Sequence, residues 1–176
     1  MVGEGNKLYC KECGNGVEID EYYDFHYLHE GDTAPISPSA WVDWERTQVI
    51  KEIRADENYS FSCECDIGEL PKYKYLKDPN TTVECGEGTI TIDHTGLSFV
   101  GKKYDEDFTF HLDYKTLFSL VIVTDCTFFS LYVNGKYYEF HPERPSVIKA
   151  LLITEEMHRM HVNKWKNLPW MNHIYE

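Results

Sequence analysis

Apolar and polar side chains alternate along a series of short segments in the last two thirds of the chain, which is the pattern of half-buried β-strands. In the segment YSFSCECDI, the side chains of Phe61, Cys63 and Cys65 share one face, while serines and acidic residues share the other. Between two such segments, Asn134 and Gly135 predict a tight hairpin, because both residues tolerate a positive φ. The pattern therefore predicts an antiparallel sheet whose strands are joined by short turns.

The periodicity changes to that of an amphipathic helix near the end of the chain, within residues 145–160. Pro142 and Pro145 interrupt the strand pattern, and Val147 and Leu151 then repeat at helical spacing. We expect this apolar stripe to close the open mouth of a curled sheet or barrel. The interior would then have no room for a reaction centre.

A second helix is predicted over residues 34–57, where Ser37 can cap the first turn. Trp41 and Trp44 lie near one side of this helix, and Arg46 follows them. Tryptophans at helical spacing usually pack against a neighbouring element, so we expect these three residues to hold the helix on the sheet domain. The other interpretation is an exposed aromatic patch that binds a partner.

These patterns predict an α+β chain that is mostly β and has four parts. Residues 1–33 contain a Cys-x-x-Cys pair among polar and aromatic residues, and residues 34–57 form the connecting helix. Residues 58–163 form the sheet-and-helix domain, and residues 164–176 form a tail without clear periodicity.

The chain has 176 residues and a formal net charge of −13. This charge disfavours binding to nucleic-acid phosphates and to anionic membranes unless lysines gather locally. No apolar run is long enough to cross a bilayer, and the N-terminus lacks the apolar region of a secretory signal. Six cysteines in such a chain do not indicate a disulfide framework. We therefore expect a cytoplasmic protein without a transmembrane segment.

Cys10 and Cys13, within CKECGNG, are spaced so that their thiolates can hold one zinc ion. The glycine that follows lets the backbone turn sharply around the metal. A redox dithiol is disfavoured because no βαβ pattern surrounds the pair. A structural zinc needs four ligands, so two more are required unless the pair is simply two free cysteines. Three sources could supply them: a second Cys-x-x-Cys outside this sequence, the pair His26 and His29, or the pair Cys63 and Cys65.

Lysines gather at one place, the segment PKYKYLKD, where Lys72, Lys74 and Lys77 are interleaved with Tyr73 and Tyr75. Lysines beside aromatic residues can contact a lipid headgroup at a membrane surface. The alternation equally fits an ordinary strand with lysines outward and tyrosines half buried. A lipid or membrane-surface adaptor that uses Lys72, Tyr73, Lys74 and Lys77 is therefore the second functional hypothesis.

Catalytic motifs are absent from the sequence. The histidines of the second half are scattered, and no nucleophile-elbow sequence accompanies them. A hydrolase or transferase is therefore the third hypothesis. A nucleic-acid-binding finger is disfavoured further, because no basic surface accompanies the cysteine pair.

Part of the chain resembles the pleckstrin-homology (PH) superfold in its GRAM-like bacterial form. The resemblance lies in three segments: GTITIDHTGLSFVG, FTFHLDYKTLFSL and the YYEF before the last helix. With LYCKECGNGVEIDEYYDF and WVDWERTQVIKEI, they are similar to the C-terminal accessory region of some Firmicutes 1-acyl-glycerol-3-phosphate acyltransferases, over residues 8–160. The resemblance implies a zinc ribbon, a tryptophan-rich helix and a PH-like domain. Such a ribbon has two knuckles, and this sequence contains one, at Cys10 and Cys13. The acyltransferase motif His-x-x-x-x-Asp is absent, so the resemblance does not imply that this chain is an enzyme.

The sequence thus predicts a non-catalytic PH-like binding or regulatory module with a zinc knuckle at Cys10 and Cys13. It would act as a protein-interaction domain linked to lipid metabolism. The expected partner is another protein or the rest of a longer polypeptide. Peripheral membrane contact is the alternative, and nucleic acid is not expected.

Overall fold

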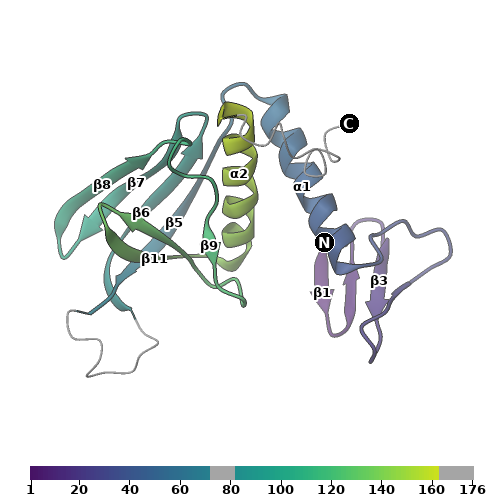
Figure 1. The fold of residues 1–176 in the computed structure, drawn as a ribbon. Helices are drawn as coiled ribbons and strands as arrows, with labels where there is room; N and C mark the ends of the chain where they lie inside the picture. Colours follow the sequence, from purple (N-terminus) through teal and green to yellow (C-terminus); the bar gives the residue numbers. More distant parts are fainter. Residues whose placement is uncertain (72–81, 163–176) are drawn as a thin grey trace. The chain divides into compact units, whose positions relative to one another are not determined.

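The computed structural model describes residues 1–71 and 82–162, and the chain divides into two compact units, Met1–Gln48 and Val49–Glu176. Each unit has its own antiparallel sheet (Figure 1). The predicted class, α+β with mostly β-structure and a C-terminal helix, is confirmed. Within the described residues, no helix is both long enough and apolar enough to span a membrane.

The N-terminal unit contains a four-stranded sheet with strand order β1-β2-β3-β4. The strands are short, so each contributes few ladder hydrogen bonds and little buried area: β1 (Val2–Glu4), β2 (Lys7–Tyr9), β3 (Gly16–Ile19) and β4 (Phe25–Tyr27). The sequence analysis did not predict this sheet. Its strands are too short for alternation to be visible.

Helix α1 (Pro38–Ala55) confirms the helix predicted between the two sheets. Ser37 caps it as expected, because its Oγ accepts a hydrogen bond from the amide of Ala40 at 3.2 Å. The boundary between the two units falls inside this helix, after Gln48. Its second half carries Val49 and Ile53 into the core of the large unit.

The large unit contains a seven-stranded sheet with strand order β8-β7-β6-β5-β11-β10-β9. Strand β5 pairs with both β6 and β11, so it joins the early strands to the late ones. Among described residues, β8 and β9 are the edges, so the sheet is open and the predicted barrel form does not occur. The strands are β5 (Ser60–Glu69), β6 (Val83–Asp93), β7 (Gly96–Lys103), β8 (Glu106–Leu112), β9 (Val121–Ile122), β10 (Phe129–Val133) and β11 (Lys136–Pro142).

The alternation read from the sequence of β5 holds in the structure. Cys65 and Ile67 are buried, whereas Glu64 and Asp66 are exposed. The predicted hairpin between β10 and β11 is also present, with Asn134 and Gly135 at φ values of 52° and 76°. One face of the large sheet is therefore apolar and the other is polar and open to solvent.

The core of the large unit lies between the apolar face of its sheet and helix α2 (Arg144–Val162). Phe140 stacks on Phe129 with ring centroids 5.4 Å apart, and further phenylalanines extend the aromatic cluster. Val147 and Ile153 of α2 are fully buried in the same core. The last helix is present and packs on the apolar face of the sheet, whereas its predicted closing of a barrel mouth does not occur because the sheet is open. The filled core leaves the polar face as the place for a site.

Two glycines allow β6 and β7 to approach closely. Gly88 is paired with Gly101, and a Cβ at Gly88 would lie 2.5 Å from the ring of Phe99 and 2.6 Å from the carbonyl oxygen of Val100. Any side chain at Gly88 would therefore push the two strands apart. Glycine at this pair lets the ring of Phe99 cover the backbone.

Candidate functional site

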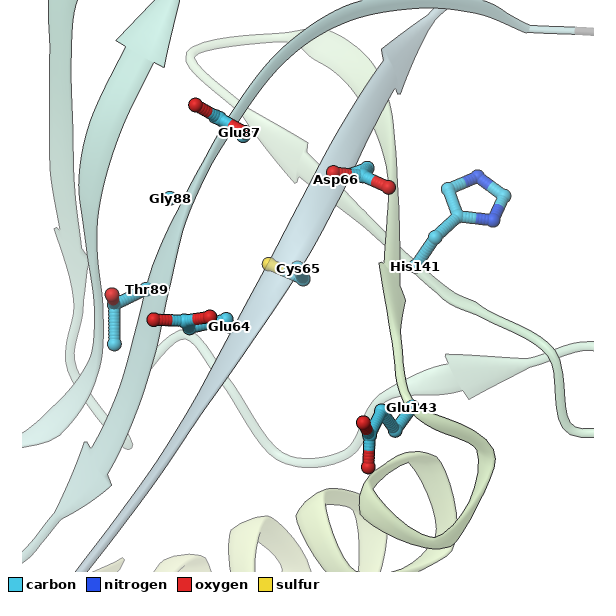
Figure 2. Close-up of a pocket in the computed structure, with 8 residues that line it drawn as sticks. All are labelled: Glu64, Cys65, Asp66, Glu87, Gly88, Thr89, His141 and Glu143. Carbon is cyan, nitrogen blue, oxygen red and sulfur yellow. The ribbon is translucent and has the colours of Figure 1, made fainter.

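A hollow of about 520 Å³ lies on the polar face of the large unit's sheet (Figure 2). It is formed by β5, β6, β11 and the residue before α2, and its polar side chains are Glu64, Asp66, Glu87, Thr89, His141 and Glu143. Because side chains alternate between the faces of a strand, the pattern that buries Cys65 and Ile67 necessarily presents Glu64 and Asp66 here.

Two acidic residues occupy paired positions on neighbouring strands in this hollow. Asp66 on β5 is paired with Glu87 on β6 and, on its other side, with His141 on β11. Like charges at directly opposed positions destabilise a sheet. Glu87 is also paired with Lys102 on β7, which offsets part of this repulsion, and the remaining negative charge attracts a cation.

A second hollow, of about 440 Å³, continues the first, since Asp66 and His141 line both. It adds Glu84 and Glu139 to the acidic lining, and the Nε2 atom of His141 lies 3.5 Å from the carboxylate of Glu139. We use the term acidic groove for the two hollows together, with its charged residues Glu64, Asp66, Glu84, Glu87, Glu139, His141 and Glu143.

The described lining of the acidic groove offers no reactive thiol. Cys65 contributes to its wall, but the side chain is buried on the core side, and burial raises the pKa of its thiol to about 12. The thiol therefore stays protonated and is a poor nucleophile. Among the described residues that line the groove, His141 is the only imidazole. The carboxylates of the groove attract positively charged groups.

The structure places Cys10 and Cys13 in the loop between β2 and β3. The amides of Cys13 and Glu12 donate hydrogen bonds to the sulfur of Cys10, which lowers the pKa of this thiol. The amide of Gly14 donates to the carbonyl oxygen of Cys10 at 2.9 Å, and Gly14 has a φ of 77°. This turn already stabilises a thiolate, which is the form that binds zinc.

His26 and His29 each pair with an aspartate in the N-terminal unit. The Nε2 atom of His26 lies 2.8 Å from Asp20, and the Nδ1 atom of His29 lies 3.3 Å from Asp32. Across residues 1–71 and 82–162, no group of three or more His, Cys, Asp or Glu side chains has the geometry of a metal site. Zinc binding, and the identity of its ligands, stay predictions.

A second loop, residues 28–33, lies beside the cysteine loop. The side-chain oxygen of Asn15 accepts hydrogen bonds from the amides of Thr33 and Ala34, at 2.9 and 3.1 Å. Asp32 accepts bonds from the amides of His29 and Gly16, at 2.9 and 3.4 Å. The side-chain amide of Asn15 and the carboxylate of Asp32 thus connect the two loops through hydrogen bonds.

Trp41 and Trp44 lie in the N-terminal unit and contact each other edge to face, with ring centroids 5.8 Å apart. Both line a cavity of about 100 Å³ together with Asn15 and Pro35, and Arg46 follows them on the same helix. The docking of these three residues on the large sheet stays a prediction.

Two sets of predicted site residues remain: the predicted membrane-contacting residues and the cysteine pair on β5. Lys72, Tyr73, Lys74 and Lys77, the predicted membrane-contacting residues, lie outside the described part of the chain. Cys63, proposed with Cys65 to complete a zinc site, is half buried on the core face of β5, and burial raises the pKa of its thiol to about 11.

The sequence analysis missed a histidine cluster at the end of α2. The Nδ1 atom of His94 lies 3.0 Å from Nε2 of His161, and the ring of His161 stacks on Tyr114. His158 is buried, and its Nδ1–H donates to the carbonyl oxygen of Tyr114 at 2.7 Å. The spacing of His158 and His161 on a helix was visible in the sequence, but nothing indicated that His94 would join them.

The chain matches no protein-family model and no curated protein. Among solved structures, it superposes on a chain of SsgB with a TM-score of 0.32 and 8% sequence identity, over 62% of this chain and 93% of that chain. The structure of SsgB comes from a study of mutations that correlate to longitudinal cell division during sporulation of Streptomyces coelicolor. A likeness of this size supports no conclusion about fold or function.

Proposed function

We propose that this protein is a non-catalytic, PH-like binding module whose acidic groove holds a positively charged segment of a protein partner. The observation that carries the proposal is the direct opposition of Asp66 and Glu87 in a groove that also contains Glu64, Glu139 and Glu143. A lysine- or arginine-rich segment would relieve this repulsion and gain charge-assisted hydrogen bonds. The proposal assigns the cysteine loop a structural role, with zinc held by Cys10 and Cys13.

Three further features support binding over catalysis. The core of the large unit is filled with buried aromatic side chains, and the groove is an open hollow on the outside of the sheet. The one cysteine in its wall is buried with a raised pKa. The proposal includes the expected role beside an enzyme of lipid synthesis, which rests on the resemblance of the sequence alone.

Binding of a fluorescein-labelled oligolysine peptide, followed by anisotropy at low and at physiological salt, tests the groove. The variant Asp66→Asn/Glu87→Gln/Glu143→Gln removes three groove carboxylates. The matched control Glu57→Gln/Asp105→Asn/Glu106→Gln changes the net charge equally at exposed positions outside the groove. With about 0.5 kcal/mol per exposed charge pair, the groove variant should bind about tenfold more weakly.

Equal weakening in both variants would mean that the peptide responds only to net charge, which would contradict a groove-specific site. Co-sedimentation with vesicles containing anionic lipid tests the membrane hypothesis in parallel. Binding to these vesicles that is lost in Lys72→Gln/Lys74→Gln/Lys77→Gln would favour a membrane-surface adaptor instead. We expect no sedimentation with vesicles at physiological salt, because the chain carries a net charge of −13.

A further inference from the structure

Strand β8 forms the long outer edge of the large sheet (Figure 1). Among the residues that the structure describes, it pairs with β7 along one side and with no strand along the other. The opposite edge, β9, has two residues, whereas β8 has seven. An edge strand of this length presents a row of backbone N–H and C=O groups that can pair with a further strand.

The turn between β7 and β8 determines which backbone groups of β8 point outward. Tyr104 and Asp105 form a two-residue turn with φ values of 49° and 66°, so the flanking residues Lys103 and Glu106 form a hydrogen-bonded pair. Hydrogen-bonded and non-hydrogen-bonded pairs then alternate along the ladder. Every second residue after Glu106 therefore points its backbone groups toward β7, and the residues between them point theirs away from the sheet. The outward-pointing residues are Asp107, Thr109 and His111.

The side chains of β8 are arranged symmetrically around Thr109, its central residue. On the apolar face, Phe108 and Phe110 flank Thr109, and both are half buried. On the polar face, Asp107 lies two positions before Thr109 and His111 lies two positions after it, and both are exposed. An antiparallel partner of the same sequence would therefore meet aromatic with aromatic and carboxylate with imidazole.

We propose that two copies of this protein associate through their β8 strands, paired antiparallel around a two-fold axis at Thr109. In this register, Thr109 lies opposite Thr109 of the second copy, and Asp107 lies opposite His111 of the second copy. The three outward-pointing residues all fall in hydrogen-bonded pairs, each of which exchanges two N–H···O bonds. A register shifted by one residue would lose these bonds, and a shift by two would shorten the overlap of the strands.

The side chains on both faces of the joined sheet favour the same register. The two-fold axis is perpendicular to the sheet, so the apolar faces of both copies lie on one side. Phe108 then lies opposite Phe110 of the second copy in a non-hydrogen-bonded pair, where side chains approach most closely. This contact extends the aromatic cluster, in which the rings of Phe108 and Phe110 are already 5.7 Å apart.

On the polar face, the imidazole of His111 can donate a hydrogen bond across the junction. Its Nδ1 atom lies 2.9 Å from Oγ of Ser98, so Nε2 is the atom that would meet the carboxylate of Asp107 of the second copy. The net charge of −13 on each chain opposes association, so the dimer should become stronger as salt screens this repulsion. The inference goes beyond the acidic groove and is independent of it, because β8 does not line the groove.

The test is the mass of the full-length chain in solution, measured by light scattering after size-exclusion chromatography over a wide range of protein and salt concentrations. We expect the mass to rise from 20.7 kDa to twice that value as the protein concentration increases. The dissociation constant should be lower at physiological salt than at low salt.

Thr109→Pro removes one outward-pointing N–H from each copy. The ladder with β7 does not use this N–H, so the monomer should stay folded, which far-ultraviolet circular dichroism verifies. The loss of both central hydrogen bonds should weaken the dimer at least about tenfold. Thr109→Val keeps the N–H and is the matched control, with an unchanged dissociation constant.

An exchange of charges tests the register and remains informative even if Thr109→Pro fails to fold. His111→Asp places a carboxylate opposite Asp107 of the second copy at two places, and should weaken the dimer about tenfold. Asp107→His/His111→Asp exchanges the two partners and should recover most of this loss. A merely structural role of His111 would give no such recovery.

Three outcomes would overturn the proposal. A chain that stays at 20.7 kDa at every protein and salt concentration does not pair through β8. A dimer that Thr109→Pro leaves unchanged forms at another surface. A double exchange that weakens the dimer as much as His111→Asp alone contradicts the register at Thr109. None of these outcomes affects the acidic groove, which the oligolysine experiment tests separately.

Discussion

The two sheets of this protein are stabilised by different means. In the N-terminal unit, Val17 and Ala34 are the buried apolar residues, whereas the large unit buries a continuous core that includes Phe99, Phe129 and Phe140. The small sheet depends instead on hydrogen bonds between side chains and the backbone of its loops, such as those that Asn15 accepts. Backbone hydrogen bonds within its turns add to these.

The difference shows how size determines what holds a β-structure together. A sheet of four short strands buries too little apolar surface to offset the entropy of ordering its chain, and small units of this kind usually need a metal, a disulfide or a partner. The loop with Cys10 and Cys13 lies in the N-terminal unit, which is the unit that requires such additional stabilisation. The large unit has enough core to fold by packing, so its polar face is free to carry a charge pattern that costs stability.

The largest effect is expected from emptying the aromatic core. Phe140 is fully buried and lies within 6 Å of three other phenylalanine rings, measured between centroids. Phe140→Ala should lower the free energy of unfolding of the large unit by about 3–5 kcal/mol. Urea denaturation followed by near-ultraviolet circular dichroism measures this loss.

Val100→Ala is the control, since 63% of the Val100 side chain is exposed, and it should change stability by less than about 0.5 kcal/mol. If amide exchange in residues 1–48 accelerated as much as in the large unit, the two units would not be stabilised independently, and the comparison would be wrong.

A smaller effect is expected from cutting the hydrogen bonds that connect the two N-terminal loops. Asn15→Ala removes the acceptor for the amides of Thr33 and Ala34 and the donor to the Thr33 hydroxyl. A hydrogen bond contributes about 0.5–1.5 kcal/mol to stability, and partly exposed ones lie at the low end. The free energy of unfolding of the N-terminal unit should therefore fall by about 1–2 kcal/mol. Hydrogen exchange at Thr33 and Ala34 reports this loss.

The control is Asn58→Ala, which removes an amide that the small sheet does not use. Unchanged protection at Thr33 and Ala34 in Asn15→Ala would show that other contacts hold this loop.

The smallest effect is a pH response of opposite sign in the two units. Burial, together with the neighbouring His94, lowers the pKa of His161, so the folded state favours the neutral ring. Its contribution is complete above the unfolded pKa of about 6.5 and is lost as the pH falls through the folded value. The effect should stay below about 1 kcal/mol, because the ring is largely exposed.

His26 should respond in the other direction. Its hydrogen bond to Asp20 raises the pKa of His26, so the folded state favours the charged ring. This contribution is present below a pH of about 6.5 and is lost as the pH rises through the folded value. Histidine titration by NMR, compared with urea unfolding of His161→Gln and His26→Gln between pH 5 and pH 8, checks both signs. The same sign for both histidines would contradict the assigned partners.

The large unit could be predicted well from the sequence, because its features are local. The alternation around Cys65, the Asn134-Gly135 turn and the helical period after Pro145 each follow from neighbouring residues. The open form of the sheet could not be predicted, because it depends on the pairing of β5 with β11, which lie far apart in sequence.

The candidate site was less predictable. The alternation in β5 already placed Glu64 and Asp66 on the polar face, but only the register of three strands brings Glu87 and His141 beside them. The Cys10 and Cys13 pair was found from its spacing. The backbone hydrogen bonds that lower the pKa of the Cys10 thiol depend on the loop conformation, which the spacing alone does not specify.

Helix α1 belongs to both units, since the boundary after Gln48 divides it, and this limits how the protein can be dissected. A truncation at the boundary would leave each fragment with a half-helix too short to be stable alone, one lacking its C-terminal turns and the other lacking the Ser37 cap. Fragments that fold separately must therefore overlap, one ending after Ala55 and the other beginning before Ser37. A protease that cleaved inside α1 would damage both sheets with a single cut.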